Sequence, residues 1–295
     1  MLTSTFDFCT VNYAFVDTDG ADVKTRVEHA FAKTRVAREG LAPLQILFIA
    51  PHEYSWQENL ALVQSRQWDW IHLSSAGYDF FPVKDVPKET FLTRTFSAYD
   101  EPITEYVLRE ILRFSPRGIL GTDIGVIGFG NIGKNLAKVL QLLGANVTVL
   151  RQQTRGCFNG INHTDRLSDL YQCDQLALTL PLTADNTGLL GREFFQQCKP
   201  GINIINVSRG EHIDQDALVQ LSAERKIHAC LDVSTPEPLP AGHPLRTMKN
   251  IRLTEHIAWQ NGDDENYFIR DFIKNLLLIL GSEPPEGRIY KAETK

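Results

Sequence analysis

The stretch "GVIGFGNIGK", residues 125–134, decides the fold of this chain. It places Gly128, Gly130 and Gly133 directly after an apolar run and directly before a helical pattern. In a G-x-G-x-x-G loop, the first glycine permits a tight turn and the second lets the backbone approach a pyrophosphate. The third glycine lets helix and strand pack closely. The loop therefore predicts a dinucleotide site, although the glycines alone leave open a turn without a ligand.

The length and composition of the chain favour a globular protein of two domains. The chain has 295 residues, of which 43% are hydrophobic and 22% charged, so a large core can form. Its net charge of -6 argues against a nucleic-acid binder, which would present a basic face. No apolar run is long enough to cross a bilayer, and we predict no signal peptide.

The cysteines predict neither a disulfide framework nor a metal site. There are five of them, an odd number, and they are scattered without a C-x-x-C pair. This usage favours a reducing compartment, and we predict a cytoplasmic protein.

Short apolar runs alternate with helical patterns along the chain, which indicates an α/β fold with parallel sheets. A helix over 100–114 is expected to link two domains, and the polar end, 281–295, is expected to be poorly ordered. The other predicted helices cover 22–38, 131–143, 187–197, 215–224 and 264–280. The predicted strands cover 45–50, 70–74, 90–95, 124–127, 147–150, 175–180, 203–207, 229–233 and 251–253.

The residue that ends the strand after the glycine loop normally selects the nucleotide. An acidic residue there binds the ribose 2′-OH of NAD, whereas an arginine accommodates the 2′-phosphate of NADP. Here Arg151 follows the strand in "VTVLRQQTR", with no Asp or Glu nearby. Its planar, charged fork, with Gln152 as a further donor, favours NADP(H) over NAD(H). The alternative is a solvated surface arginine.

Three separate segments place polar side chains after predicted strands. "NVSRGEHID" contains Arg209, "CLDVSTPEPLP" contains Asp232 and Glu237, and "LTEHIAW" contains His256. Ligands of open parallel sheets bind beyond the carboxyl ends of the strands, so these residues are expected to converge on the cofactor crevice. The alternatives are a surface or capping arginine, an exposed glutamate in a turn and a hydrogen-bonded core histidine.

The region from Leu180 to Trp259 resembles the D-isomer-specific 2-hydroxyacid dehydrogenase family. The matching pieces are "LPLTADNTGLL", "KPGINIINVSRGEHIDQDALVQ", "ACLDVSTPEPLPAGHPL" and "IRLTEHIAW". The glycine loop, the helix that contains Glu105 and the segment "SSAGYD" at 74–79 also fit. The resemblance implies two doubly wound parallel-sheet domains. A Rossmann cofactor domain, 100–259, would be inserted into a flavodoxin-like substrate domain made of 1–99 and 260–295.

The resemblance also implies a role for each matching residue. Arg209 would grip the substrate carboxylate and carbonyl oxygen, His256 would be the general acid/base, and Glu237 would hydrogen-bond the histidine. Asp232 would contact the nicotinamide end of the cofactor. The backbone N–H groups of Ala76 and Gly77 would hold the substrate carboxylate. Further cofactor contacts are implied at Asn131, Ile132, Leu180, Pro181 and Val207.

These residue types suit the reduction of a 2-keto acid. Hydride transfer to carbon builds negative charge on the carbonyl oxygen, which a fixed guanidinium stabilises. The oxygen also needs a proton, which histidine can supply near neutral pH. A neighbouring carboxylate favours the protonated imidazole.

The sequence departs from the family at two places. Glu255 stands beside His256 where the family usually has proline, and in an extended segment we expect it to face solvent. Only 23 residues separate Glu105 from Gly128, because a longer segment that often takes part in subunit contact is missing. We therefore predict a homodimer but leave its interface open.

The sequence thus predicts an NADP(H)-dependent reductase of small 2-keto acids, such as glyoxylate or hydroxypyruvate. The family implies an (R)-2-hydroxy acid as the product. One alternative is a dinucleotide-binding regulatory or corepressor-type protein with little turnover. Another is a hydrolase that uses bound NAD as a redox relay, similar to adenosylhomocysteine hydrolase.

Overall fold

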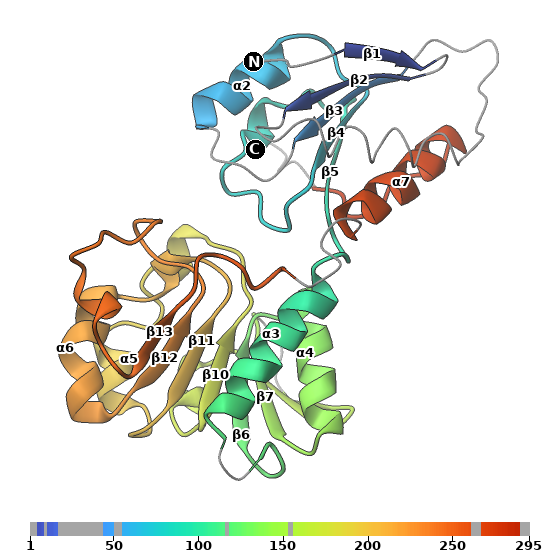
Figure 1. The fold of residues 1–295 in the computed structure, drawn as a ribbon. Helices are drawn as coiled ribbons and strands as arrows, with labels where there is room; N and C mark the ends of the chain where they lie inside the picture. The colour runs from blue at the N-terminus through green and yellow to red at the C-terminus, as the bar shows by residue number, and fades with distance from the viewer. Residues whose placement is uncertain are drawn as a thin grey trace. The chain divides into compact units, whose positions relative to one another are not determined.

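The computed structural model describes residues 5–8, 11–16, 44–49, 55–115, 118–152, 156–260 and 267–289 (Figure 1). The chain divides into two compact units. Unit 1 consists of Met1–Tyr99 and Asp263–Lys295, and unit 2 is the continuous segment Asp100–Gly262. The helix predicted over 22–38 lies outside the described residues.

Unit 1 contains a five-stranded sheet in the order β1-β2-β3-β4-β5. The first two strands are antiparallel and the other pairs are parallel. The described strands follow chain order, so the strand reversal of a flavodoxin-like sheet is not among them. The strands are β1 (Thr5–Phe8), β2 (Val11–Val16), β3 (Leu44–Ile49), β4 (Trp70–Leu73) and β5 (Phe91–Arg94).

The sheet of unit 1 has a hydrophobic cluster on each face. On β3, alternate residues point to opposite faces, so Phe48 packs with α7 (Tyr267–Leu280) while Leu47 packs in the cluster that includes Val63 of α2 (Trp56–Gln64). The α2 helix begins at a capping box, in which Ser55 and Glu58 bond each other's backbone N–H groups. Because β3 buries apolar side chains on both faces of the sheet, each face must be covered.

The expectation of a poorly ordered C-terminal end is wrong for residues 281–289. The N–H of Ile289 donates to the carbonyl of Leu92 at 2.9 Å, and Arg288 forms a bridge with Thr93 of β5. Ile289 is also buried. Apolar burial and edge pairing outweigh the polar composition of this segment, and residues 290–295 lie outside the described part.

Unit 2 contains an eight-stranded sheet in the order β13-β12-β11-β10-β6-β7-β9-β8, which confirms the α/β class with parallel sheets. The strand order reverses between β6 and β10, where a doubly wound sheet places its ligand crevice. The strands are β6 (Asp123–Ile127), β7 (Asn146–Leu150), β8 (Gly156–Phe158), β9 (Ile161–Thr164), β10 (Gln175–Leu178), β11 (Asn203–Asn206), β12 (His228–Leu231) and β13 (Ile251–Leu253).

The register of this sheet aligns the carboxyl ends of its parallel strands. Leu178 of β10 pairs with Ile127 of β6 on one side and with Asn206 of β11 on the other. Asn206 pairs in turn with Leu231 of β12, which pairs with Leu253 of β13. The segments that follow these strands therefore emerge at one edge of the sheet.

Helices cover both faces of the unit 2 sheet. Leu176 and Leu178 of β10 pack in the core with α5 and α6, whereas Gln175 of the same strand bonds the carbonyl of Ile111 in α3. The α4 helix contacts β6 and β7. The helices are α3 (Asp100–Arg113), α4 (Asn131–Leu142), α5 (Arg192–Gln197) and α6 (Gln215–Arg225).

Two local predictions for unit 2 need correction. The helix expected from residue 187 begins only at Arg192, because Gly188 has a φ of +65° and bonds Glu211 through its N–H. The β8–β9 hairpin was missed: its strands are only three and four residues long, and β8 is exposed along its whole length.

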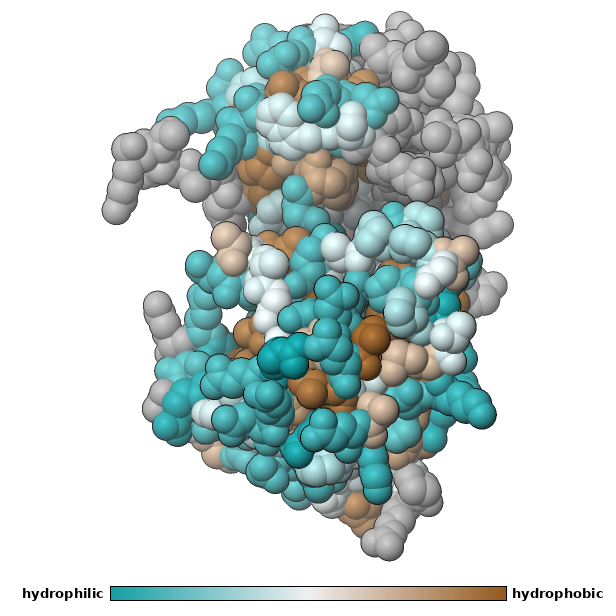
Figure 2. All heavy atoms as spheres, turned by 90° about the vertical axis from the view of Figure 1, so that its left-hand side faces the viewer, coloured by the Kyte–Doolittle hydropathy of each residue, from teal (hydrophilic) through white to brown (hydrophobic). Residues whose placement is uncertain are grey.

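Among the described residues, none of the helices has the length and apolar character needed to span a membrane. Figure 2 shows one side of the protein, on which the described surface is mostly hydrophilic and hydrophobic areas are small and separate.

Candidate active site

The glycine loop joins β6 to α4, and two of its glycines are required by close packing. Gly128 has a φ of +103°, and a Cβ there would lie 2.8 Å from the carbonyl oxygen of Thr179. A Cβ on Gly133 would lie 2.3 Å from the carbonyl oxygen of Gly128. By contrast, a Cβ on Gly130 would meet no atom within 4 Å, and Gly130 caps α4 without a side-chain hydrogen bond. The loop therefore leaves space at the amino end of α4, where Asn131 and Ile132 lie.

Arg151 leaves the end of β7 beside three other side chains. Its Cζ lies 5.0 Å from the ring centroid of Phe129, and Lys134 Nζ lies 5.8 Å from the same centroid. His163 of β9 packs edge-on against Phe129 at 4.8 Å. Burial, and then the charge of Arg151, lower the pKa of His163. Gln152 is exposed beside this group.

Sequence analysis missed Phe129, Lys134 and His163 as parts of this group. Phe129 occupies a variable position of the glycine motif, and the hairpin that supplies His163 was not predicted. The aromatic residue between Gly128 and Gly130 was the signal available in the sequence.

Arg209 follows β11 in a loop that is closely packed against the next strand's loop. Its Nη1 donates to the carbonyl of Ser208 at 2.8 Å, and its own carbonyl accepts from Asn206 Nδ2 at 2.8 Å. A Cβ on Gly210 would lie 2.2 Å from the carbonyl carbon of Ser234. Gly210 thus lets the Arg209 loop approach the segment that leads to Glu237.

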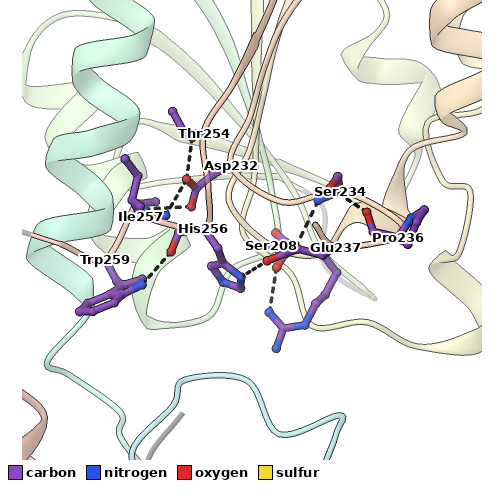
Figure 3. A network of polar contacts seen from close by, with 11 residues as sticks. Ser208, Asp232, Ser234, Pro236, Glu237, Thr254, His256, Ile257 and Trp259 are labelled. Atoms are coloured by element: carbon purple, nitrogen blue, oxygen red, sulfur yellow. Dashed lines mark hydrogen bonds and ion pairs between the residues drawn. The ribbon is translucent and has the colours of Figure 1, made fainter. Parts of the chain in front are cut away.

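Glu237 and His256 form a hydrogen bond between two loops (Figure 3). The Glu237 Oε1 lies 2.7 Å from His256 Nδ1. Because a carboxylate only accepts hydrogen bonds, Nδ1 carries a proton and Nε2 is left to exchange one. Burial raises the pKa of Glu237, but the hydrogen bond and charge of His256, the Ser234 N–H and the charge of Arg209 outweigh it, so the pKa lies below its ordinary value.

The turn that carries His256 is hydrogen-bonded to Asp232, which directly follows β12. His256 has a φ of +56°, its N–H donates to the Asp232 carbonyl at 2.8 Å, and its carbonyl accepts from Trp259 Nε1 at 2.8 Å (Figure 3). Asp232 is 1% exposed, and its carboxylate accepts hydrogen bonds from this same turn. Glu255 is exposed, as expected.

Leu180 and Pro181 follow β10, and Val207 follows β11 at the same edge of the sheet. The Leu180 N–H donates to Ser208 Oγ at 3.2 Å, which joins two of these loops. Buried His212 supports these loops: its Nε2 lies 3.3 Å from the Leu180 carbonyl and its Nδ1 lies 3.2 Å from the Asn186 carbonyl.

Unit 2 therefore brings the predicted residues to one sheet edge, whereas Ala76 and Gly77 belong to unit 1. Their carbonyls accept from Arg94 Nη1 at 2.8 Å and from Ser75 Oγ at 2.7 Å. In the described part of the chain, no three His, Cys, Asp or Glu side chains are grouped to hold a metal ion.

Comparisons with known proteins identify relatives of the chain. Residues 90–258 match the family described as D-isomer specific 2-hydroxyacid dehydrogenase, NAD binding domain. Human glyoxylate reductase/hydroxypyruvate reductase is 34% identical over 174 residues, which cover 57% of this chain and about half, 52%, of that protein. Glyoxylate/hydroxypyruvate reductase B of Pectobacterium atrosepticum is 30% identical over 72% of this chain and 76% of its own length.

Solved structures share the fold. A D-isomer specific 2-hydroxyacid dehydrogenase from Xanthobacter autotrophicus, in complex with NADPH and MES, has a TM-score of 0.77 at 22% identity and covers 94% of this chain and 97% of its own. A probable 2-hydroxyacid dehydrogenase from Rhizobium etli, in complex with NADP, has a TM-score of 0.75 at 22% identity, with the same coverage of both chains. The chain therefore belongs to the D-isomer specific 2-hydroxyacid dehydrogenase family.

Proposed function

We propose that this protein is an NADP(H)-dependent reductase that converts small 2-keto acids to (R)-2-hydroxy acids. The observation that carries the proposal is the 2.7 Å contact between Glu237 and His256 at the sheet edge that also holds Arg209 and the glycine loop. The relatives named as glyoxylate and hydroxypyruvate reductases support these two acids as the first substrates to test. A regulatory protein that only bound a dinucleotide would not need a paired acid and base.

The residues present fit a bound dinucleotide. Gly128 and Gly133 provide the tight turn and close packing, and the amino end of α4 provides N–H groups and a partial positive charge for the pyrophosphate. Arg151 offers a 2′-phosphate a charged fork beside Lys134, which supports NADP(H) over NAD(H). When bound, the reduced nicotinamide would supply the hydride.

The protein's own residues would bind and protonate the substrate. The Arg209 guanidinium would orient the carboxylate and stabilise the charge that develops on the carbonyl oxygen. His256 would deliver its Nε2 proton to that oxygen, while Glu237 keeps a proton on Nδ1. After transfer the imidazole is neutral, and it takes up a proton from water before the next turnover. Asp232 would contact the cofactor end, and the backbone N–H groups of Ala76 and Gly77 would bind the substrate carboxylate.

The described cysteines, Cys157, Cys173, Cys198 and Cys230, are free thiols, which supports a reducing compartment such as the cytoplasm.

We also propose a homodimer. Three exposed leucines are candidates for its interface. Leu120 is 81% exposed, Leu142 is 75% exposed, and Leu143 is also exposed. A Leu142→Lys substitution should disrupt a dimer that uses this surface. Light scattering is expected to give twice the 33.3 kDa chain mass for the wild type and the single mass for the variant. A wild-type monomer at micromolar concentration would contradict this part of the proposal.

The reductase proposal is tested by assaying glyoxylate, hydroxypyruvate and larger 2-keto acids with NADPH and with NADH. Arg209→Ala should reduce kcat/KM by at least ~100-fold while NADPH binding persists, because the arginine stabilises charge on the substrate. Arg192→Ala, an exposed site on α5, is the control. Turnover of no 2-keto acid by the wild type, or full activity of Arg209→Ala, would refute the proposal.

A further inference from the structure

The turn that carries His256 is bonded to Asp232 through consecutive backbone N–H groups. Three consecutive N–H groups donate to Asp232: His256 to its backbone carbonyl at 2.8 Å, Ile257 to Oδ1 at 2.8 Å and Ala258 to Oδ2 at 2.9 Å. Figure 3 shows Asp232 beside His256 and Ile257. The φ of +56° at His256 is unfavourable for a residue with a Cβ. Such a conformation persists only where the surroundings fix it. The Asp232 carboxylate therefore helps to fix the turn that positions His256.

A chain of hydroxyl groups reaches the same carboxylate. Thr254 Oγ1 donates to Asp232 Oδ1 at 2.6 Å, and the Tyr106 hydroxyl lies 2.6 Å from Thr254 Oγ1. Thr254 has one hydroxyl hydrogen, and Asp232 already accepts it. The Tyr106 hydroxyl must therefore donate to Thr254, so the hydrogen bonds run from Tyr106 through Thr254 to Asp232.

This series of hydrogen bonds begins at a buried residue. Tyr106 lies on α3 and is 2% exposed, and its hydroxyl oxygen lies 3.3 Å from the sulfur of buried Cys230. Burial raises the pKa of Cys230 to about 12 and raises the pKa of Tyr106 above its ordinary value. Both groups keep their hydrogens at neutral pH. The links from Tyr106 through Thr254 then both point toward Asp232.

We infer that Tyr106 and Thr254 are positioning residues for His256, which they hold in place through the Asp232 carboxylate. The Thr254 hydroxyl, which Tyr106 orients, donates to Oδ1, while the Ile257 and Ala258 N–H groups of the His256 turn donate to Oδ1 and Oδ2. Without the Thr254 bond, the carboxylate can rotate and the turn loses a fixed partner. This inference rests on the proposed function, since it assigns His256 the proton transfer.

The test compares Thr254→Val, which removes the hydroxyl but keeps the shape, with Thr254→Ser, which keeps the hydroxyl. With NADPH and hydroxypyruvate, Thr254→Val should lower kcat by about 10- to 100-fold, because small displacements of a catalytic group have effects of this size. The Kd for NADPH should change by less than kcat does, since the glycine loop and Arg151 are untouched and only the Asp232 contact at the cofactor end is affected. Thr254→Ser should keep most of the wild-type kcat. Tyr106→Phe should show a smaller loss of kcat, with Tyr171→Phe as its matched control.

A readout without turnover separates this inference from the proposed function. Hydrogen exchange at the Ile257 and Ala258 amides should accelerate in Thr254→Val and remain near wild type in Thr254→Ser. An inactive wild type would refute the reductase proposal, while the exchange rates would still decide the positioning role. Unchanged exchange and unchanged kcat in a folded Thr254→Val variant would overturn the inference, as would equal losses in the Val and Ser variants. If Thr254→Val fails to fold, Tyr106→Phe and Thr254→Ser provide the comparison.

Discussion

Oε1 of Glu237 lies 2.7 Å from Nδ1 of His256, although the two residues are 19 positions apart and follow different strands. Burial alone would raise the pKa of Glu237, so its lowered pKa depends on His256 and the other donors around it. In His256→Ala the opposing effect of burial remains, and the carboxyl pKa is expected to rise toward or above its ordinary value. Carboxyl ¹³C NMR titration of Glu237 in both proteins measures the shift.

The sign of this coupling also fixes its pH range. The folded-state pKa of Glu237 is lowered, so the pair stabilises the protein above the ordinary carboxyl pKa of 4.5 and this stabilisation is lost as pH falls through the lowered value. An unchanged Glu237 titration in His256→Ala would mean that the pair is not formed in solution.

Phe129 is predicted to support cofactor selection through Arg151. Its ring lies under the Arg151 guanidinium, so Phe129→Leu should weaken NADPH binding by about two- to fivefold, in line with an exposed cation–π contact. NADH binding should change less, because it has no 2′-phosphate. Fluorescence titration of both cofactors measures this difference, and Phe129→Tyr, which keeps a ring, is the control. Equal losses for the two cofactors would assign Phe129 only a role in loop packing.

His72 should make unit 1 sensitive to acid. It is fully buried among Phe48, Trp70 and Phe272, and burial lowers its pKa to about 3 against a weaker opposing effect of the Asp271 charge. The unfolded chain binds a proton near pH 6.5, so stability is expected to fall between pH 6.5 and about 3.

The contribution of His72 should reach about 1.4 kcal/mol per pH unit in that range. Urea unfolding followed by tryptophan fluorescence reports on unit 1, which contains buried Trp68 and Trp70. His72→Gln should reduce the slope of stability against pH, whereas His243→Gln in unit 2 should not. Identical slopes in wild type and His72→Gln would contradict this origin of acid sensitivity.

Asp271 is predicted to be the main hydrogen-bond acceptor for the backbone of residues 96–98, where the first segment of unit 1 ends. Its Oδ2 accepts from the N–H groups of Phe96 and Ser97 at 2.8 Å and from Ala98 at 3.3 Å, and Oδ1 accepts from Ser97 Oγ at 2.7 Å. Asp271→Ala leaves these donors unsatisfied and should cost at least about 2 kcal/mol of the free energy of unfolding. Urea unfolding measures this cost, with exposed Asp216→Ala as the control. A loss no greater than the control's would show that water replaces the carboxylate.

The sequence was sufficient to predict the strands and helices with strong apolar periodicity. β13 has the predicted bounds, and β4, β6 and α4 differ by one residue at one end. β4 and β6 each contain a run of four consecutive buried residues, and the buried residues of α4 recur at helical spacing. The β8–β9 hairpin could not be predicted, since its first strand is fully exposed and carries no periodic apolar signal. The late start of α5 depends on pairing between the Gly188 segment and a distant loop, which local propensity does not encode.

The candidate site was predictable as a set of residues but not as a network. Polar residues after apolar strands, together with the family resemblance, predicted Arg209, Glu237 and His256. The bond from Thr254 to Asp232 and the contact from Tyr106 depend on how α3 packs on the sheet, and residues 148 positions apart carry no local pattern that joins them.

The two outermost strands of unit 2, β8 and β13, are each only three residues long. Another chain that paired with either of these edge strands would form few backbone hydrogen bonds, so these edge strands offer little template for fibril growth. The wide sheet needed to span a dinucleotide is thereby kept from becoming an aggregation hazard.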